Sequence, residues 1–173
     1  RSGTATPRDF VEFPSQVNEH WAWQPDRVLP AELLDKLKDA RSFNQGFGSL
    51  EIMAATLLDQ AWHQTPLDAL PRSGDEVEDF ERRALEFWGV ASDLVPPRYR
   101  STYFSHIFGG GYAAGYYSYL WSEQYAAAVS ELFEDHGGLD PELGARYRSE
   151  VLSLGFSVDP LSALRKFLDD EVT

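Results

Sequence analysis

One stretch of this sequence, His106-Ile-Phe-Gly-Gly-Gly-Tyr112-Ala-Ala-Gly-Tyr116-Tyr-Ser-Tyr119-Leu-Trp121, joins a histidine and three consecutive glycines to a tyrosine-rich segment. If the segment after the glycines is helical, the spacing of Tyr112, Tyr116 and Tyr119 places their side chains on one face. Glycines let a ligand approach the backbone closely, and phenols donate hydrogen bonds. The stretch therefore predicts a polar helix face that holds a substrate backbone, and by itself it does not indicate a chemistry.

The rest of the chain reads as helices separated by proline and glycine. Apolar periodicity, Asp-Pro pairs and glycine stops predict helices over residues 30–40, 50–62, 76–88, 113–135, 140–154 and 159–168. Residues 101–108 are β-prone, so one very short β segment is expected there. Because there is no internal repeat and no long linker, residues 1–173 are expected to form a single all-α domain.

The N-terminal segment carries a second helical pattern. Its apolar residues recur at helical spacing, at Phe10, Phe13, Val17 and Trp21. Pro14 lies inside this pattern, so it is expected either to start the regular helix or to kink it. Residues 24–26, Gln-Pro-Asp, are expected to end the segment.

Composition excludes several classes of function. The 173 residues are 43% hydrophobic and carry a formal net charge of −13, which describes a globular protein unsuited to nucleic acid or an anionic membrane surface. The chain has no cysteine, which excludes disulfides and thiolate metal sites and favours a reducing compartment such as the cytoplasm. Neither a signal peptide nor a membrane-spanning run is evident. The first residue is Arg1, which is compatible with a chain that starts inside a longer protein.

Two common catalytic motifs are missing. The four histidines include no pair at positions i and i+4, so the zinc-binding sequence His-Glu-x-x-His is absent. There is also no Gly-x-Ser-x-Gly elbow of a serine hydrolase. Taken alone, the chain shows no complete catalytic centre.

The candidate site residues each allow two interpretations. Glu12, with Asp9 one turn earlier, is either part of a solvated polar face or a carboxylate metal ligand supported by Asp9. His106 is either a turn histidine bonded to backbone or a substrate contact. Tyr112, Tyr116 and Tyr119 form either an aromatic core stripe or a functional face. On the opposite side of that helix, the better core candidates are Tyr117, Leu120 and Trp121.

Two stretches together resemble a known family. Residues 2–21, which include Asp9-Phe-Val-Glu12, and residues 104–121, quoted above, closely resemble the thimet oligopeptidase family of zinc metallopeptidases. The match is nearest to its bacterial peptidyl-dipeptidase and oligopeptidase A branch. Residues 147–168 are similar to the family's C-terminal helices, so the resemblance covers essentially the whole chain.

The resemblance implies a fold and a metal site. Members have a predominantly helical, two-lobed shell around a deep channel, and they hydrolyse short peptides. Their zinc is bound by two histidines of a His-Glu-x-x-His helix and by one later glutamate. Glu12 matches that glutamate and Asp9 matches its supporting partner. The chain is thus expected to be the C-terminal portion of such a catalytic domain.

The resemblance also implies roles for the Gly-Tyr stretch. Tyr112 and Tyr119 would donate hydrogen bonds to the scissile carbonyl as it becomes an oxyanion. His106 and Tyr116 would contact the substrate, and the loop of Gly109, Gly110 and Gly111 would flex as the substrate enters.

The sequence departs from the family by lacking the His-Glu-x-x-His helix, which is expected upstream of Ser2. One carboxylate cannot complete a zinc site, so the chain alone is expected to be inactive unless the missing N-terminal part supplies the rest. Two alternatives remain open, a natural helical module that binds peptides without cutting them, and a product of proteolysis or truncation. In a fragment, uncovered apolar surface is expected to cause self-association.

Overall fold

The computed structural model describes residues 5–22 and 30–168, and these form helices and turns with no strand. The expected all-α class is therefore confirmed. The chain divides into two compact units, residues 1–36 with 118–173, and residues 37–117. Helix α3 (Ala31–Ser42) contains the boundary between them. The expectation of a single domain stays a prediction.

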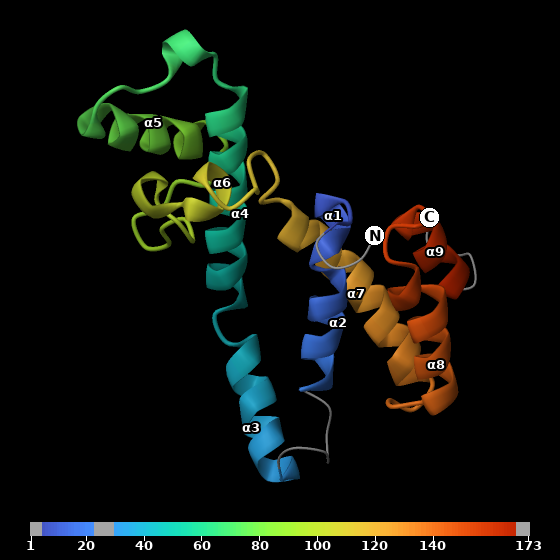
Figure 1. The fold of residues 1–173 in the computed structure, drawn as a ribbon. Helices are drawn as coiled ribbons and strands as arrows, with labels where there is room; N and C mark the ends of the chain where they lie inside the picture. The colour runs from blue at the N-terminus through green and yellow to red at the C-terminus, as the bar shows by residue number, and fades with distance from the viewer. Residues whose placement is uncertain (1–4, 23–29, 169–173) are drawn as a thin grey trace. The chain divides into compact units, whose positions relative to one another are not determined.

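The first unit is built around helix α7 (Ser118–Asp135). Helices α1 (Arg8–Val11) and α2 (Phe13–Trp21) pack along α7, as Figure 1 shows in blue and orange. Helices α8 (Pro141–Glu150) and α9 (Pro160–Phe167) complete the unit, with the short 3-10 turn η3 (Leu152–Leu154) after α8. Its core is one cluster of apolar side chains that includes Phe13, Val17, Val129, Phe133, Tyr147, Leu164 and Phe167.

The N-terminal apolar pattern is confirmed as a core face. Phe10, Phe13 and Val17 are buried, and the ring of Trp21 meets Phe133 edge to face at 4.8 Å between centroids. The helical path breaks at Glu12, and Pro14 lies in the first turn of α2. That is where proline is tolerated, because its missing N–H would have no partner there. The expected stop at residues 24–26 lies outside the described residues.

Both Asp-Pro pairs begin helices, as predicted. The carboxylate of Asp140 accepts the N–H of Leu143 at 2.7 Å, and that of Asp159 accepts the N–H of Ser162 at 2.7 Å. Each aspartate thereby satisfies one of the amides left without an intrahelical partner at the start of α8 and α9.

The second unit is centred on helix α4 (Gln45–Gln64), against which helix α5 (Gly74–Phe87) packs. The core between them contains Ala54, Leu58, Phe80 and Leu85, with Trp62 packed at its edge. A 3-10 turn, η1 (Leu67–Ala69), lies in the connection between the two helices. After α5, the chain returns to α4, where the N–H of Arg98 donates to the carbonyl of Glu51 at 2.9 Å.

The expected β segment at residues 101–108 is wrong. These residues form a 3-10 turn, η2 (Ser101–Tyr103), and one helical turn, α6 (Ser105–Phe108). The buried carboxylate of Glu81, on α5, accepts both the N–H and the hydroxyl of Ser101 at 2.9 Å. The N–H of Phe108 donates back to the carbonyl of Phe104 at 3.4 Å. These local bonds occupy groups that a strand would offer to a neighbouring strand, so the β propensity of the residues is overridden.

Among the described helices, none is both long and apolar enough to cross a bilayer.

Candidate functional site

The predicted site residues belong to two different units. Asp9, Glu12 and Tyr119 lie in the first unit, and the others, His106, Gly109, Gly110, Gly111, Tyr112 and Tyr116, lie in the second.

The glycine loop of the second unit folds back onto the end of α6. The carbonyl of Ser105 accepts the N–H of Gly109 at 2.9 Å and that of Gly110 at 2.7 Å, and the N–H of Tyr112 donates to the carbonyl of His106 at 2.9 Å. A Cβ added to Gly110 would lie 2.9 Å from the Cα of His106. The loop thus needs glycine at position 110, because backbone passes too close to backbone there for a Cβ.

The predicted tyrosine helix face is wrong for two of its three members. Helix α7 begins at Ser118, so it includes Tyr119, whereas Tyr112 and Tyr116 lie in the turns that precede it. Ala114 has φ of +53°, a left-handed conformation that a right-handed helix cannot contain. Spacings of three and four residues therefore do not place these phenols together.

The cause is an aspartate on another helix, which the sequence interpretation missed. The carboxylate of Asp59, on α4, accepts the N–H of Ala114 through Oδ1 and the N–H of Tyr116 through Oδ2, each at 2.9 Å. In a helix those amides would donate to carbonyls four residues earlier. A signal was available, because Asp59 directly follows the mostly apolar residues 52–58, and buried carboxylates are nearly always paired.

Two neighbours of Asp59 extend this contact. The side-chain amide of Gln60 donates to the carbonyl of Ala114 at 3.0 Å. Both backbone polar groups of Ala114, its N–H and its carbonyl, are therefore bound by side chains of α4. The Nδ1 atom of His63 lies 2.8 Å from Oδ1 of Asp59. Asp59 is fully buried, at 0% exposure, whereas a quarter of the His63 side chain is accessible.

His106 is brought together with the tyrosines by this loop. Its ring centroid lies 4.7 Å from that of Tyr99, 5.6 Å from that of Tyr116 and 6.0 Å from that of Tyr112. The last two contacts are edge to face, the favoured geometry for aromatic rings. The aromatic–histidine cluster, defined here as Tyr99, His106, Tyr112 and Tyr116, is the part of the predicted substrate face that is assembled within one unit.

The exposed fractions of the aromatic side chains differ from those that the sequence predicted. Tyr116, a predicted substrate contact, is only 5% exposed, while the predicted core residues Tyr117 and Trp121 are 38% and 49% exposed. The expectation of Tyr117 and Trp121 in the core is wrong, because the helix on which it depended starts only at Ser118. Burial raises the pKa of Tyr116 to about 12, so its phenol keeps its proton at neutral pH and remains a hydrogen-bond donor.

In the first unit, Glu12 lies at the break between α1 and α2, close to the start of α7. Gln16, one turn after Glu12, donates through its side-chain amide to the carbonyl of Tyr119 at 3.0 Å. The hydroxyl of Ser122 donates to the carbonyl of Asp9 at 3.0 Å. These two bonds attach both short helices to α7, so the unit holds Asp9, Glu12 and Tyr119 on packed helices.

The first unit contains one of the zinc ligands that the sequence predicted, Glu12. Glu12 is half-buried and offers carboxylate oxygens, which are suitable zinc ligands. Within residues 5–22 and 30–168, no three histidine or acidic side chains gather in a way that could hold a metal ion. The described residues therefore offer the carboxylate of Glu12 as one donor, and not a complete site.

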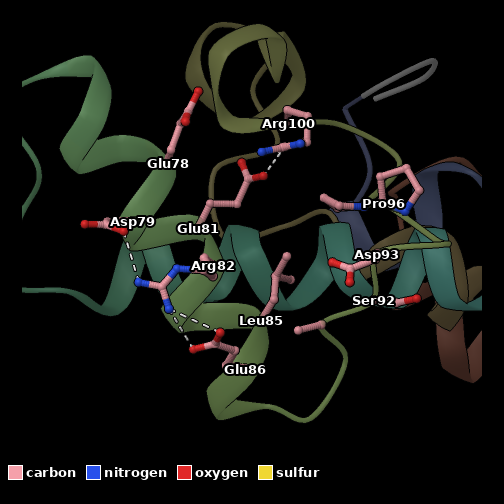
Figure 2. Close-up of a pocket in the computed structure, with 12 residues that line it drawn as sticks. Glu78, Asp79, Glu81, Arg82, Leu85, Glu86, Ser92, Asp93, Pro96 and Arg100 are labelled. Carbon is pink, nitrogen blue, oxygen red and sulfur yellow. Dashed lines mark hydrogen bonds and ion pairs between the residues drawn. The ribbon is translucent and has the colours of Figure 1, made fainter.

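The second unit also contains a polar pocket. Figure 2 shows it between α5 and the loop that follows, lined by charged side chains of both signs. Arg82 pairs with Asp79 and with Glu86, each at 3.0 Å, and Arg100 pairs with Glu81. None of the predicted site residues lines this pocket, and its arginines are already paired with the acids beside them.

Comparison with known proteins identifies the class to which this fold and these motifs belong. A model of peptidase family M3 matches residues 1–173, the whole chain, so this protein belongs to that family.

Among individual relatives, the dipeptidyl carboxypeptidase of Escherichia coli is 46% identical over 170 residues, covering 91% of this chain and 24% of the relative. A thimet-like oligopeptidase of Dictyostelium discoideum is 34% identical, covering 96% and 26%. Oligopeptidase A of Escherichia coli is 32% identical, covering 95% and 25%. The chain thus spans about a quarter of the length of these relatives, and the resemblance to the oligopeptidase family is confirmed.

Proposed function

We propose that the complete protein containing this chain is a zinc-dependent peptidase that hydrolyses peptide bonds in short peptides. The observation that carries this proposal is the match of all 173 residues to peptidase family M3. The names of the relatives, dipeptidyl carboxypeptidase and oligopeptidase A, support peptides as the substrate class. A cytoplasmic location fits a chain with no cysteine.

In this proposal Glu12 is the carboxylate zinc ligand, oriented by Asp9. When bound, zinc would supply an activated water and polarise the scissile carbonyl. The chain's further contribution lies on the substrate side. Tyr112 and Tyr119 donate hydrogen bonds to the carbonyl oxygen as negative charge develops on it.

His106 holds the substrate backbone, with Tyr116 packed edge to face against its ring. The glycine loop 109–111 moves as the peptide enters. This arrangement is supported by the cluster's composition, since it combines an imidazole with three phenols, and burial raises the pKa of one of them, Tyr116, to about 12.

By itself the 173-residue chain is proposed to be inactive. It contains no His-Glu-x-x-His sequence, and a zinc site needs three protein ligands of which it offers one. The partner that completes the site is the N-terminal part of the same protein. Nucleic acid and anionic membranes are not proposed as partners, because the net charge of −13 would repel them.

The isolated chain is also proposed to self-associate. Large apolar side chains are exposed on the second unit, among them Leu67, Phe87, Trp88 and Leu94. Exposed apolar patches of this kind favour association in water. Light scattering of the isolated chain should show a mass that rises with concentration, and a constant monomer mass would contradict this.

The main experiment measures cleavage of a fluorescence-quenched peptide by the complete protein. Activity should be lost with a chelator and restored by zinc. Glu12→Gln should lower kcat/KM at least about 100-fold together with the zinc content, because it removes a metal ligand. The control is Glu19→Gln, an exposed glutamate on α2, which should leave both unchanged.

Two outcomes would overturn the proposal. If the complete protein binds the peptide but does not cleave it, the peptide-binding module is the correct function. If the isolated chain cleaves the peptide in a chelator-sensitive way, the site does not need the missing part.

A further inference from the structure

A buried carboxylate outside the predicted site controls the loop that carries the site tyrosines. Asp59 is fully buried on α4, and its two oxygens accept the N–H groups of Ala114 and Tyr116 at 2.9 Å each. A carboxylate so far from water is stable only when its oxygens are satisfied. The two amides satisfy it, and in exchange they hold the backbone on either side of Gly115.

The backbone around Ala114 has a conformation that is unfavourable without these hydrogen bonds. Ala114 has φ of +53°, which is unfavourable for a residue with a Cβ. Gln60, the next residue on α4, donates to the carbonyl of Ala114 at 3.0 Å. Two neighbouring side chains of one rigid helix thus bind the peptide units around Ala114, and Tyr112 and Tyr116 flank this point.

His63 adds a third contact on the same carboxylate. Its Nδ1 atom lies 2.8 Å from Oδ1 of Asp59, one turn along α4. The same Nδ1 atom also lies 2.9 Å from the backbone carbonyl oxygen of Asp59, so the imidazole stays beside the carboxylate oxygen that accepts the N–H of Ala114. Asp59 is therefore contacted by both its own helix and the loop.

We propose that Asp59 is a positioning residue for peptide hydrolysis, which holds the 112–116 loop so that Tyr112 and Tyr116 face His106. This inference rests on the proposed function, because the tyrosines matter only if the cluster contacts the substrate. Asp59 itself touches neither substrate nor metal in this scheme. It acts through the backbone, from a rigid helix, where a small error in geometry is costly to turnover.

Asp59→Asn is the most direct test. Asparagine has nearly the same size, but one carboxylate oxygen becomes an NH2 group, which cannot accept a hydrogen bond. One of the two loop amides would then face a donor instead of an acceptor. The loop should loosen while the surrounding core keeps its volume.

The matched control is Glu81→Gln. Glu81 is also a buried carboxylate of the second unit, on α5, and it also accepts a backbone N–H, that of Ser101. It does not bond to residues 112–117. It therefore reproduces the general cost of neutralising a buried carboxylate without releasing the tyrosine loop.

The experiment uses the complete protein and two separate readouts. Hydrogen exchange in the absence of peptide should show the amides of Ala114 and Tyr116 exchanging at least about tenfold faster in Asp59→Asn than in wild type. With a quenched peptide, kcat should fall about 100-fold while KM changes by less than about threefold. In Glu81→Gln, both the exchange of these amides and kcat should stay at wild-type values, even if the melting temperature falls.

Gln60→Ala provides a second variant if Asp59→Asn does not fold. Gln60 is partly buried, and its substitution removes the bond to the carbonyl of Ala114 together with one that Gln60 accepts from the side-chain amide of Gln64 at 3.1 Å. It should lower kcat in the same direction by a smaller factor, about threefold to tenfold.

The outcomes separate this inference from the proposed function. If wild-type protein cleaves no peptide, the proposed function fails, and the exchange data alone still decide whether Asp59 holds the loop. If the amides of Ala114 and Tyr116 remain protected in Asp59→Asn, or if they lose protection while kcat stays at the wild-type value, the positioning role is overturned. An equal loss of kcat in Asp59→Asn and Glu81→Gln would also overturn it.

Discussion

Gly110 lies against the backbone of His106 so closely that no other residue fits there without movement. A Cβ built on Gly110 would lie 2.9 Å from the Cα of His106 and 3.0 Å from its carbonyl oxygen. These are backbone atoms, which cannot turn aside as the end of a flexible side chain can. The glycine run is therefore more than a flexible loop, since its middle residue sets the position of the histidine.

The first prediction concerns this contact. Gly110→Ala should lower the free energy of unfolding by about 1–3 kcal/mol, because the loop must move away from α6 to make room. Urea denaturation of the 173-residue chain measures the change. Gly109→Ala is the control, since its Cβ would meet only the carbonyl of Ser105, at an ordinary 3.7 Å, and it should change stability by less than about 0.5 kcal/mol. Equal losses in the two variants would contradict the steric argument.

The second prediction concerns a buried phenol in the first unit. The hydroxyl of Tyr147 is buried in the cluster with Phe13 and Phe167 and has no hydrogen-bond partner within the described part of the chain. Burial also raises the pKa of Tyr147, since its charged form would be unsolvated there. Tyr147→Phe removes this unsatisfied group, so it should leave the free energy of unfolding unchanged or raise it by about 1 kcal/mol. A loss of more than about 1 kcal/mol in urea denaturation would show that the hydroxyl has a partner after all.

The third prediction concerns the response to high pH. Burial raises the pKa of Tyr116 from 10.0 to about 12, so between these values the folded chain keeps a proton that the unfolded chain releases. The contribution of Tyr116 to the free energy of unfolding is therefore fully present below pH 10 and is lost as pH rises toward 12. The urea midpoint should drop less between pH 9 and pH 11 in Tyr116→Phe than in wild type. In the control Tyr117→Phe, the drop should equal that of wild type.

The fourth prediction concerns the start of α9. Hydrogen bonds from the hydroxyl and the N–H of Ser162 lower the pKa of Asp159 below its ordinary value of 3.8. Asp159→Ala should cost about 1 kcal/mol near neutral pH through loss of the helix cap. The difference from wild type should shrink as pH falls below 3.8, because the folded chain then takes up the proton that weakens the cap. Asp159→Asn keeps an acceptor and should retain most of the stability at every pH in urea denaturation.

The fifth prediction concerns turnover in the complete protein. If Tyr112 and Tyr119 donate hydrogen bonds to the developing oxyanion, then Tyr112→Phe and Tyr119→Phe should each lower kcat about 100-fold to 1,000-fold. KM should change little, because the bond forms fully only in the transition state. Steady-state kinetics with a quenched peptide measures both constants, and Tyr117→Phe should behave as wild type. A rise in KM with unchanged kcat would instead make these tyrosines ground-state contacts.

Much of the fold was predictable because the signals are local. Asp140-Pro141 and Asp159-Pro160 each combine a capping side chain with a residue suited to a first helical turn, and both begin helices. The spacing of Phe10, Phe13 and Val17 places them on one helical face, and these three side chains are buried as expected. Family membership was also evident, since the motif residues are contiguous in the sequence.

The residues 101–108 and 112–117 were not predictable in the same way. Their backbone groups are bound by carboxylates from distant positions, Glu81 for the first segment and Asp59 for the second. Periodicity describes only a segment's own preference, and a buried carboxylate that offers two acceptors can outweigh it. The sequence shows Asp59 directly after the mostly apolar residues 52–58, but it does not show which amides that acid binds.

The sequence by itself thus determined the helical class, most helix starts, the family, and the residue types of a substrate face. Only the tertiary structure decided how that face is made. Tyr112 and Tyr116 meet His106 because Asp59 and Gln60 of α4 hold Ala114 in a left-handed turn, not because a helix aligns the phenols. The physical reason is that capping and apolar periodicity act over one or two turns, whereas a buried charge must find its partners wherever the fold brings them.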